Sequence, residues 1–414
     1  MKLLIIIAVI ISGLYSLALS IVQYRSASNP TPENLRDVYD SETYERWKRY
    51  STEHSRLSIL SELVSVALSV AMLATNVYSA FASLFGDGWF IELFSVVLLE
   101  RVVGTVASVI FSYIGRMKIE EKYGFNRSTV KTFVIDKIRG FIIELSLSLG
   151  IVVLLRAVHV WLGDWMILLF AVAIFAITLV ISFFYPILSR IGNKFTPLEE
   201  GELKDRLMEL LTKHGYTVKA IEVMDASRRT TKLNAYFTGF GKLKTIVLYD
   251  NLVNAMTPDE ICSVFAHELG HGLNRDVLKG QILSFGNLVI MSLIVWGAVS
   301  APVLHTAFGF SEVNYGFAYI LLSVGLGLIQ PLTSLVINAR SRKAEYRADE
   351  QAVKEGYGEA MISALKKLAR ENFSHLSPSR VNVVLEYSHP PLGDRIAAIA
   401  KHLGKAEDVI AHEE

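Results

Sequence analysis

Long apolar runs dominate the sequence and set the architecture that it predicts. A helix that crosses a bilayer needs about 20 mostly apolar residues. Five runs without Asp, Glu, Lys or Arg cover residues 3–22, 63–86, 165–189, 281–304 and 313–339. Two further runs, 93–115 and about 141–162, are apolar but carry a few ionisable residues. The first run is longer than the apolar core of a signal peptide, so we interpret it as a membrane anchor. Together the seven runs predict seven transmembrane helices.

The charge of the connecting segments supports this count. Segments 23–56 and 116–139 carry six and seven Lys and Arg residues, whereas the alternate connections 87–92, 163–164 and 305–312 carry none. Basic loops stay in the cytoplasm. With seven spans, the basic segments fall on one side together with the 190–280 segment and the tail from Arg340, and the N-terminus falls on the other. We therefore expect the large water-facing parts to be cytoplasmic.

Ionisable residues interrupt the third and fourth apolar runs. They are Glu100, Arg101, Glu144, Arg156 and His159. Such side chains are costly within a bilayer and usually face protein or a water-filled interior. They therefore indicate a polar cavity between helices. The alternative is that these two spans begin or end elsewhere and the charges lie at the membrane surface.

The water-facing segments show mixed helix and strand signals. Pro197 and the acids that follow it mark the start of an amphipathic helix over 202–214. Residues 218–224 alternate as a strand, and 234–240 with 245–249 indicate a hairpin. The stretch Thr-Pro-Asp-Glu at 257–260 is typical of a capped helix start, and 340–355 and 358–371 are expected to be polar helices. The predicted organisation is transmembrane regions at 1–189 and 281–339 and one α+β domain built from 190–280 and 340–414.

Composition narrows the function. The chain is 52% hydrophobic with a mean hydropathy of +0.39, which argues against a single soluble globule. Lys and Arg number 41 against 40 Asp and Glu, so no basic face for nucleic acid is indicated. The single cysteine, Cys262, excludes a disulfide framework and a multi-cysteine zinc site. A metal site in this chain must rest on His and carboxylate side chains.

The helix that begins at Thr257 carries the motif His-Glu-Leu-Gly-His at 267–271. Residues four apart lie on one face of a helix, so His267 and His271 can bind one ion. Glu268 lies beside the first ligand, where it can take a proton from water at the metal. The alternative is a pair of buried structural histidines.

A catalytic zinc ion takes three protein ligands and leaves one position for water. No third histidine follows closely, so we expect a carboxylate from another helix. Glu345 is the best candidate, and Asp349, four residues on, can accept a proton from a ligand imidazole. The alternative is a solvated helix in which Glu345 pairs with Arg342. The first interpretation is favoured because spans six and seven end, on the cytoplasmic side, next to His271 and Glu345.

The tail adds two candidate donors for a developing oxyanion. They are His389, which precedes two prolines, and Arg395. On the residues alone, a histidine beside prolines is more often a turn residue.

The order and spacing of these motifs resemble the zinc-dependent, type I CAAX prenyl protease family along almost the whole chain. The matching segments are 119–127, 193–201, 234–239, 249–250, 267–271, 345–349 and 388–392. The resemblance implies a barrel of seven transmembrane helices around a water-filled chamber, capped by a gluzincin-like zinc domain. It also implies one zinc ion held by His267, His271 and Glu345, with Glu268 as the base.

The resemblance implies roles for further residues. Asp349 would orient a ligand or serve in proton transfer, and His389 and Arg395 would lie at the cleavage site, with His389 as the oxyanion partner. One strand would hold the substrate as an added β-strand. This strand consists of Asn234, Ala235, Tyr236 and Phe237. The family's substrates are C-terminal Cys-a-a-X segments with an isoprenoid on the cysteine, from which the aaX tripeptide is removed.

The implied partners are a peptide or protein substrate, with or without a prenyl group, and the lipid bilayer, without nucleic acid or a required oligomer. A multi-pass protein of this family would lie in the cell membrane of a prokaryote. In a eukaryote it would lie in the endoplasmic reticulum or inner nuclear membrane, and in either case its catalytic domain would face the cytoplasm.

Two other functions share part of this pattern. Heat-shock integral-membrane zinc proteases, which act in quality control, have the same zinc motif and later glutamate but fewer spans. A transporter or channel could use the ionisable residues within the spans and keep a vestigial zinc site. Transporters tend to have paired broken helices in two related halves, and the sequence shows no such repeat. The CAAX-type protease is therefore the favoured interpretation.

Overall fold

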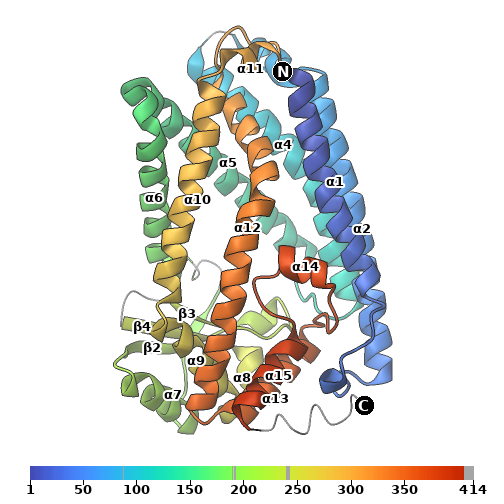
Figure 1. Ribbon diagram of the computed structural model, residues 1–414, viewed down its shortest axis with the longest axis vertical. Coiled ribbons are helices and arrows are strands. Elements are labelled where there is room, and N and C mark those ends of the chain that lie inside the picture. Colours follow the sequence, from blue (N-terminus) through green and yellow to red (C-terminus); the bar gives the residue numbers. More distant parts are fainter. Residues whose placement is uncertain (87, 189, 191–192, 239–242, 405–414) are drawn as a thin grey trace.

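The computed structural model describes residues 1–86, 88–188, 190, 193–238 and 243–404. Long helices stand side by side, and a smaller domain of helices and strands lies at one end of them (Figure 1). The long helices are α1 (Lys2–Ser26), α2 (Ser41–Ala74), α4 (Trp89–Ile114), α5 (Val130–Leu162), α6 (Met166–Leu188), α10 (Asp276–Val299) and α12 (Tyr315–Lys354). Short helical elements connect them: η1 (Glu33–Leu35), α3 (Val77–Ala82), η2 (Ser83–Phe85), η3 (Gly115–Glu120), η4 (Gly163–Trp165) and α11 (Pro302–Thr306).

Six stretches of the described chain are helical, long and apolar enough to cross a membrane, where the sequence predicts seven spans. The fourth stretch, Val130–Phe184, is 55 residues long and contains both α5 and most of α6. The predicted runs 141–162 and 165–189 therefore share this stretch. Gly163 has a φ of +53°, a left-handed conformation that favours glycine, at the point where α5 ends.

Two predicted boundaries differ from the structure. The second span was expected at 63–86, but α2 ends at Ala74 and the next helix begins after Asn76, whose φ is +57°. Apolar side chains continue through this turn, so hydropathy does not reveal it. The polar helix expected from Arg340 is not separate: it continues the seventh apolar run as α12, because no glycine or proline interrupts residues 332–354.

The smaller domain contains a four-stranded mixed sheet in the order β1-β2-β4-β3. Its strands are β1 (Phe195–Pro197), β2 (Thr217–Met224), β3 (Ala235–Thr238) and β4 (Leu243–Tyr249). β2 and β4 are parallel, and β3 pairs antiparallel with β4, as expected for the predicted hairpin. The turn of this hairpin lies outside the described residues. The strand order leaves β3 at an edge of the sheet.

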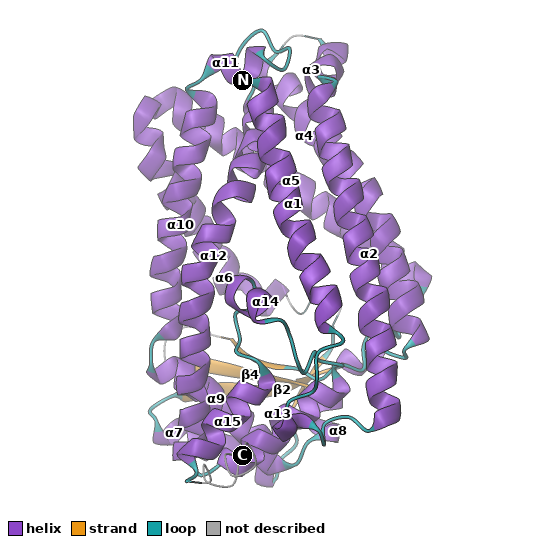
Figure 2. Cartoon of the chain, turned by 45° about the vertical axis from the view of Figure 1, so that its right-hand side comes forward, coloured by secondary structure: helices purple, strands orange, loops and turns teal. Residues whose placement is uncertain are grey.

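Helices surround this sheet, so the expected α+β domain is confirmed (Figure 2). They are α7 (Glu202–Lys213), η5 (Ala226–Arg228), α8 (Asp250–Ala255), α9 (Pro258–Leu273), α13 (Gly358–Glu371), α14 (Arg380–Leu385) and α15 (Leu392–His402). α12 runs from the membrane helices into this domain, where it packs against α9, α13 and α15 (Figure 1).

One hydrophobic core joins the α+β domain to the basic connections between the first helices. Leu35 and Trp47, from the α1–α2 region, and Tyr123, which follows η3, are buried in the same cluster as Ile246 and Phe265. The segments that the sequence predicts on the cytoplasmic side are therefore packed together at one end of the molecule. This end carries the candidate site.

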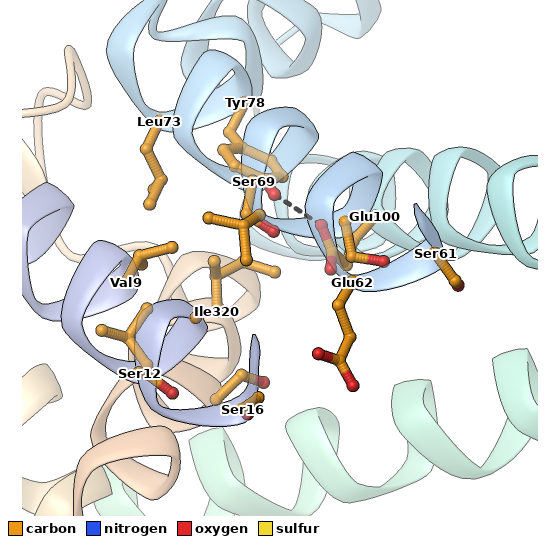
Figure 3. Close-up of a pocket in the computed structure, with 15 residues that line it drawn as sticks. Val9, Ser12, Ser16, Ser61, Glu62, Ser69, Leu73, Tyr78, Glu100 and Ile320 are labelled. Carbon is orange, nitrogen blue, oxygen red and sulfur yellow. Dashed lines mark hydrogen bonds between the residues drawn. The ribbon is translucent and has the colours of Figure 1, made fainter. Parts of the chain in front are cut away.

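Polar groups lie between the membrane helices, as the sequence predicts. A cavity of about 320 Å³ is bounded by α1, α2, α3, α4 and α12 and is lined by Glu62, Glu100 and several serines (Figure 3). The Tyr78 hydroxyl donates to Glu100 at 2.5 Å, and Ser20 donates to Glu62 at 2.7 Å. The larger chamber that the resemblance implies stays a prediction.

Candidate metal centre

The histidine motif lies on α9, and the start of this helix is fixed by a capping box. The Thr257 hydroxyl accepts the Glu260 N–H, and the Glu260 carboxylate accepts the Thr257 N–H, with Pro258 in the first turn. The helix then runs unbroken through the motif, so His267 and His271 lie on one face. Their ring centroids are 4.9 Å apart.

Gly270 lets α9 cross α12 closely. A Cβ atom at this position would lie 2.8 Å from the Cα of Ala348, so a larger residue would force the helices apart. The close crossing brings Glu345 and Asp349 of α12 against the two histidines. Glu345 is 5% exposed and Asp349 is 1% exposed, which rules out the alternative of a solvated charged helix.

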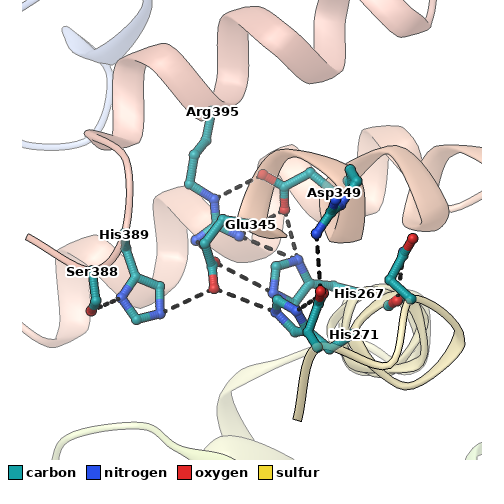
Figure 4. Close-up of polar contacts among 11 residues, drawn as sticks. His267, His271, Glu345, Asp349, Ser388, His389 and Arg395 are labelled. Carbon is teal, nitrogen blue, oxygen red and sulfur yellow. Dashed lines mark hydrogen bonds and ion pairs between the residues drawn. The ribbon is translucent and has the colours of Figure 1, made fainter. Parts of the chain in front are cut away.

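One atom each of His267, His271 and Glu345 lies within 4.8 Å of the others, as metal ligands require (Figure 4). Glu345 Oε1 is 3.3 Å from His271 Nε2, and Oε2 is 3.6 Å from His267 Nε2. Glu345 Oε2 is buried and has no hydrogen-bond partner in the described chain. The three side chains thus converge on one position, where the Glu345 carboxylate can still bind an ion.

A carboxylate contacts the Nδ1 atom of His267, and an arginine holds this carboxylate. Asp349 Oδ1 lies 2.8 Å from His267 Nδ1. Arg395 of α15 holds Asp349 with two hydrogen bonds, of 2.8 Å from Nε and 2.7 Å from Nη2, and its Nη1 is 3.4 Å from Glu345 Oε2. Burial lowers the pKa of Arg395, but Asp349 outweighs this effect and the pKa is raised overall. Arg395 therefore contacts the candidate ligands mainly through Asp349.

The same arrangement supports His271, and sequence reasoning missed it. Asp276 Oδ2 lies 3.2 Å from His271 Nδ1, and Arg347 donates to Asp276 Oδ1 at 2.9 Å. Asp276 begins α10, the helix after the motif, so spacing along α9 could not place it. Burial lowers the pKa of His271, but the carboxylates of Glu345 and Asp276 raise it to about 9. The two carboxylates therefore favour positive charge at this imidazole.

Glu268 is half-buried beside His267 on α9. No hydrogen bond or ion pair with another residue of the described chain occupies its carboxylate. This group stays available as a proton acceptor, unlike Glu345 and Asp349, which are both engaged.

The tail brings His389 to the same place. His389 Nε2 lies 3.4 Å from Glu345 Oε1, its Nδ1 is 2.9 Å from the Ser388 hydroxyl, and its side chain is 63% exposed (Figure 4). Arg342 donates to the carbonyl of Tyr387 at 2.7 Å, and so fixes the loop that leads to His389. Arg342 thus does not pair with Glu345, the partner that the alternative interpretation assigned to it.

The predicted substrate strand corresponds to β3, at the edge of the sheet. Ala235 lies opposite Leu248 of β4, and Asn234 precedes the strand and accepts the Tyr249 N–H at 3.1 Å. The other edge of β3 pairs with no strand in the described part of the sheet. This edge could accept a further strand.

Two family profiles cover nearly the whole chain. Residues 197–403 match peptidase family M48, and residues 3–190 match the CAAX prenyl protease N-terminal family, described as five membrane helices. The chain belongs to peptidase family M48. The M48 match contains every candidate site residue, and the N-terminal match contains α1, α2, α4, α5 and α6, apart from the first residue of α1.

Several relatives of this M48 peptidase are similar over nine tenths or more of their length. A CAAX prenyl protease 1 homolog of Oryza sativa is 30% identical, with 96% of this chain and 97% of the relative covered. CAAX prenyl protease 1 of Saccharomyces cerevisiae is 29% identical over 91% of this chain and 90% of the relative. The crystal structure of S. mikatae Ste24p matches with a TM-score of 0.87 and 27% identity, covering 96% of this chain and 98% of that one.

Membership of M48, together with the spans, makes this chain an integral-membrane metallopeptidase. The residues present fit a metal ion. Both imidazoles face a carboxylate at Nδ1, which favours a hydrogen there and leaves the Nε2 lone pair for an ion. The Oε2 of Glu345, which accepts no hydrogen bond in the described chain, completes a set of two nitrogens and one carboxylate.

Proposed function

We propose that this protein is a zinc endopeptidase that cleaves CAAX-type, prenylated C-terminal segments and removes the aaX tripeptide. The observation that carries the proposal is the convergence of His267, His271 and Glu345 from two helices at the end of a membrane bundle. Two histidines and one glutamate are a common ligand set of catalytic zinc. The names of the full-length relatives support the substrate class.

The residues around the site have different roles in the reaction. Zinc, when bound, lowers the pKa of a coordinated water and polarises the scissile carbonyl. Glu268 accepts the proton of the attacking water and passes it to the leaving amine, because its carboxylate is not engaged elsewhere. Asp349 and Asp276 hold the ligand imidazoles in orientation, and Arg395 and Arg347 hold these carboxylates in turn.

His389 is proposed as the donor to the negative charge that develops on the carbonyl oxygen. Its exposed ring and its position beside Glu345 support this role. Arg395 is proposed to act through Asp349 because its guanidinium is engaged there.

The edge of β3 is proposed to hold the substrate in an extended conformation. An added strand is held mainly by main-chain hydrogen bonds, so the residues of the substrate can vary. The relevant segment is Asn234, Ala235, Tyr236 and Phe237.

We also propose that the catalytic end faces the cytoplasm. The basic segments 23–56 and 116–139 lie at this end, and positive charge in short connections marks the cytoplasmic side. The compartment would be the cell membrane in a prokaryote and the endoplasmic reticulum or inner nuclear membrane in a eukaryote.

The test uses purified full-length protein with a farnesylated CAAX peptide and the same peptide without farnesyl. We expect zinc-dependent cleavage after the prenylated cysteine, loss of cleavage with a chelator, and a decrease of roughly 100- to 10,000-fold in Glu268→Gln. Glu209→Gln, an exposed glutamate on α7, is the matched control and should keep full activity.

Other outcomes distinguish the alternatives. Cleavage of only the unmodified peptide would contradict the prenyl assignment and retain the metallopeptidase. Cleavage of unfolded membrane proteins but neither peptide would favour a quality-control protease. Full activity of Glu268→Gln would contradict the catalytic mechanism itself.

A further inference from the structure

A second polar cavity lies at the end of the bundle opposite the peptidase domain. It has a volume of about 440 Å³ and is formed where α4 and α12 begin and α5 approaches its end. Figure 1 shows α11, which precedes α12, at this end of the bundle. Trp89, Glu92, Arg156, Glu312 and Tyr315 are among the residues that line it. Pockets of this size suit small ligands and ligand headgroups. None of these residues belongs to the metal centre.

Arg156 lies in this cavity and has no anionic partner within the described parts of the chain. Its guanidinium is 3.9 Å from the centroid of the Trp89 ring and 5.9 Å from that of Tyr315. Among the residues that the structure describes, it makes no hydrogen bond or ion pair. The Trp89 ring contacts a face of the guanidinium, so the five N–H donors, which lie in its plane, stay available to a ligand. An arginine within a membrane helix normally has such partners.

Carboxylates line the same cavity but do not neutralise this arginine. Glu92 and Glu312 contribute to the wall, and neither lies within ion-pair distance of a base in the described chain. The cavity therefore presents one planar cation and two separate anions. A guanidinium binds phosphate with two parallel hydrogen bonds, and carboxylates bind an ammonium group. The complementary ligand is a zwitterion with both a phosphate and an ammonium group.

The depth of the cavity indicates the source of such a ligand. Trp89 is 48% exposed, Trp161 84% and Trp165 75%, and all three lie at this end of the bundle. Exposed tryptophans mark the level of the lipid headgroups. Arg156 lies six residues before the end of α5 at Leu162, which is roughly 9 Å along the helix axis. The guanidinium is thus within reach of a phosphate at the headgroup level.

We propose that this cavity binds the headgroup of a phospholipid that carries a phosphate and a primary ammonium group. Arg156 holds the phosphate, Trp89 fixes the guanidinium, and Glu92 and Glu312 accept the ammonium. The proposal concerns the membrane end of the protein and is independent of the peptidase function.

The test is native mass spectrometry of the delipidated full-length protein, titrated with phosphatidylethanolamine, phosphatidylglycerol or inorganic phosphate. Wild-type protein should retain phosphatidylethanolamine in preference to the other two. Arg156→Gln should lower its occupancy about tenfold, because the charged hydrogen bonds are lost. Arg36→Gln is the matched control: its side chain is 72% exposed at the peptidase end, and occupancy should not change.

The double variant Glu92→Gln and Glu312→Gln tests the proposed contacts with the ammonium group of the lipid. Its result does not depend on how Arg156→Gln folds. It should bind phosphatidylethanolamine and phosphatidylglycerol equally. Unchanged phosphatidylethanolamine occupancy in a folded Arg156→Gln, or a double variant with the wild-type preference, would overturn the proposal. Equal binding of inorganic phosphate and of the lipid to wild-type protein would overturn the choice of a lipid.

Discussion

The peptidase domain and the membrane helices both carry charged groups among their packed helices, buried in the first and half-buried or more exposed in the second, and these groups have different partners. In the peptidase domain these groups form ion pairs: Arg395 contacts Asp349 at 2.7 Å, and Lys367 contacts Glu260 at 2.7 Å. Among the membrane helices, Glu100 accepts a hydrogen bond from a tyrosine hydroxyl, and Arg156 lies over a tryptophan ring. The ion pair of Arg101 with Glu144 is longer, at 3.8 Å.

This difference separates a rigid region from an adaptable one. Removing one partner of a buried ion pair leaves an uncompensated charge, whereas a hydroxyl partner can be replaced by water or by a neighbouring serine. The metal site needs ligands held in one geometry, and ion pairs fix the side chains behind it. The cavities between the membrane helices carry polar groups that keep capacity for other partners.

The largest effect on stability is expected at Arg395. Arg395→Met leaves Asp349 and Glu345 without their shared cation, so the free energy of unfolding should fall by about 3–5 kcal/mol. Denaturation in detergent measures this change. Arg380→Met is the control, because Arg380 is 82% exposed and pairs with Asp394 at the surface; it should cost less than about 1 kcal/mol. Equal losses in both variants would show that the buried ion pairs of Arg395 contribute no more to stability than an exposed pair does.

The junction of the two regions offers a pH-dependent contact at His375. Its Nδ1 accepts the Ser377 N–H, so Nε2 carries the hydrogen and donates to Ser26 at the end of α1. Burial lowers the pKa of His375 from 6.5 to about 4. Because the unfolded chain then binds the proton more readily, stability should be greatest above pH 6.5 and should fall as the pH decreases towards 4, by at most about 3 kcal/mol.

Thermal unfolding between pH 4 and pH 7 tests this contact. His375→Gln keeps a hydrogen-bond donor without the titration, so its stability should depend less on pH. His402→Gln, at the exposed end of α15, should retain the wild-type dependence. A wild-type protein whose stability does not change over this range would contradict the prediction.

Much of the architecture could be predicted, because hydropathy and helix caps report on local sequence. Thr257 marked the start of α9, and the apolar runs marked the membrane helices. Hydropathy could not show that α2 ends at Ala74, because the turn at Asn76 lies among apolar residues. Nor could it show that α12 continues to Lys354 as one helix, since helix propensity persists after the apolar residues end.

The candidate site, too, could be predicted only where its contacts follow from local sequence. Positions 267 and 271 are related by the helix repeat, so their convergence follows from spacing. The support of His271 by Asp276 and Arg347 joins two further helices, and only the fold brings them together. The role of Arg395 as a holder of Asp349 also depends on where α15 packs.

A smaller effect is expected on metal binding. It should be the same for Asp276 and Asp349, because each carboxylate contacts the Nδ1 atom of one ligand histidine. Asp276→Asn should lower zinc affinity about 10- to 100-fold, as should Asp349→Asn, because each removes the acceptor that orients a ligand imidazole. Competition with a zinc-chelating dye measures the affinity without any activity assay. Asp394→Asn, on α15 but paired with exposed Arg380, should bind zinc like the wild type. An unchanged affinity in Asp276→Asn would show that His271 needs no support.

The smallest effect is expected within the membrane helices. Tyr78→Phe removes the hydroxyl that donates to Glu100, in a cavity lined by several serine hydroxyls. These hydroxyls, or water, can replace the lost donor, so the free energy of unfolding should fall by only about 1 kcal/mol. Tyr113→Phe, on α4, is the control, because the Tyr113 hydroxyl makes no hydrogen bond in the described chain; it should leave stability unchanged. A loss at Tyr78 as large as that of Arg395→Met would mean that the membrane region holds its charges as rigidly as the peptidase domain does.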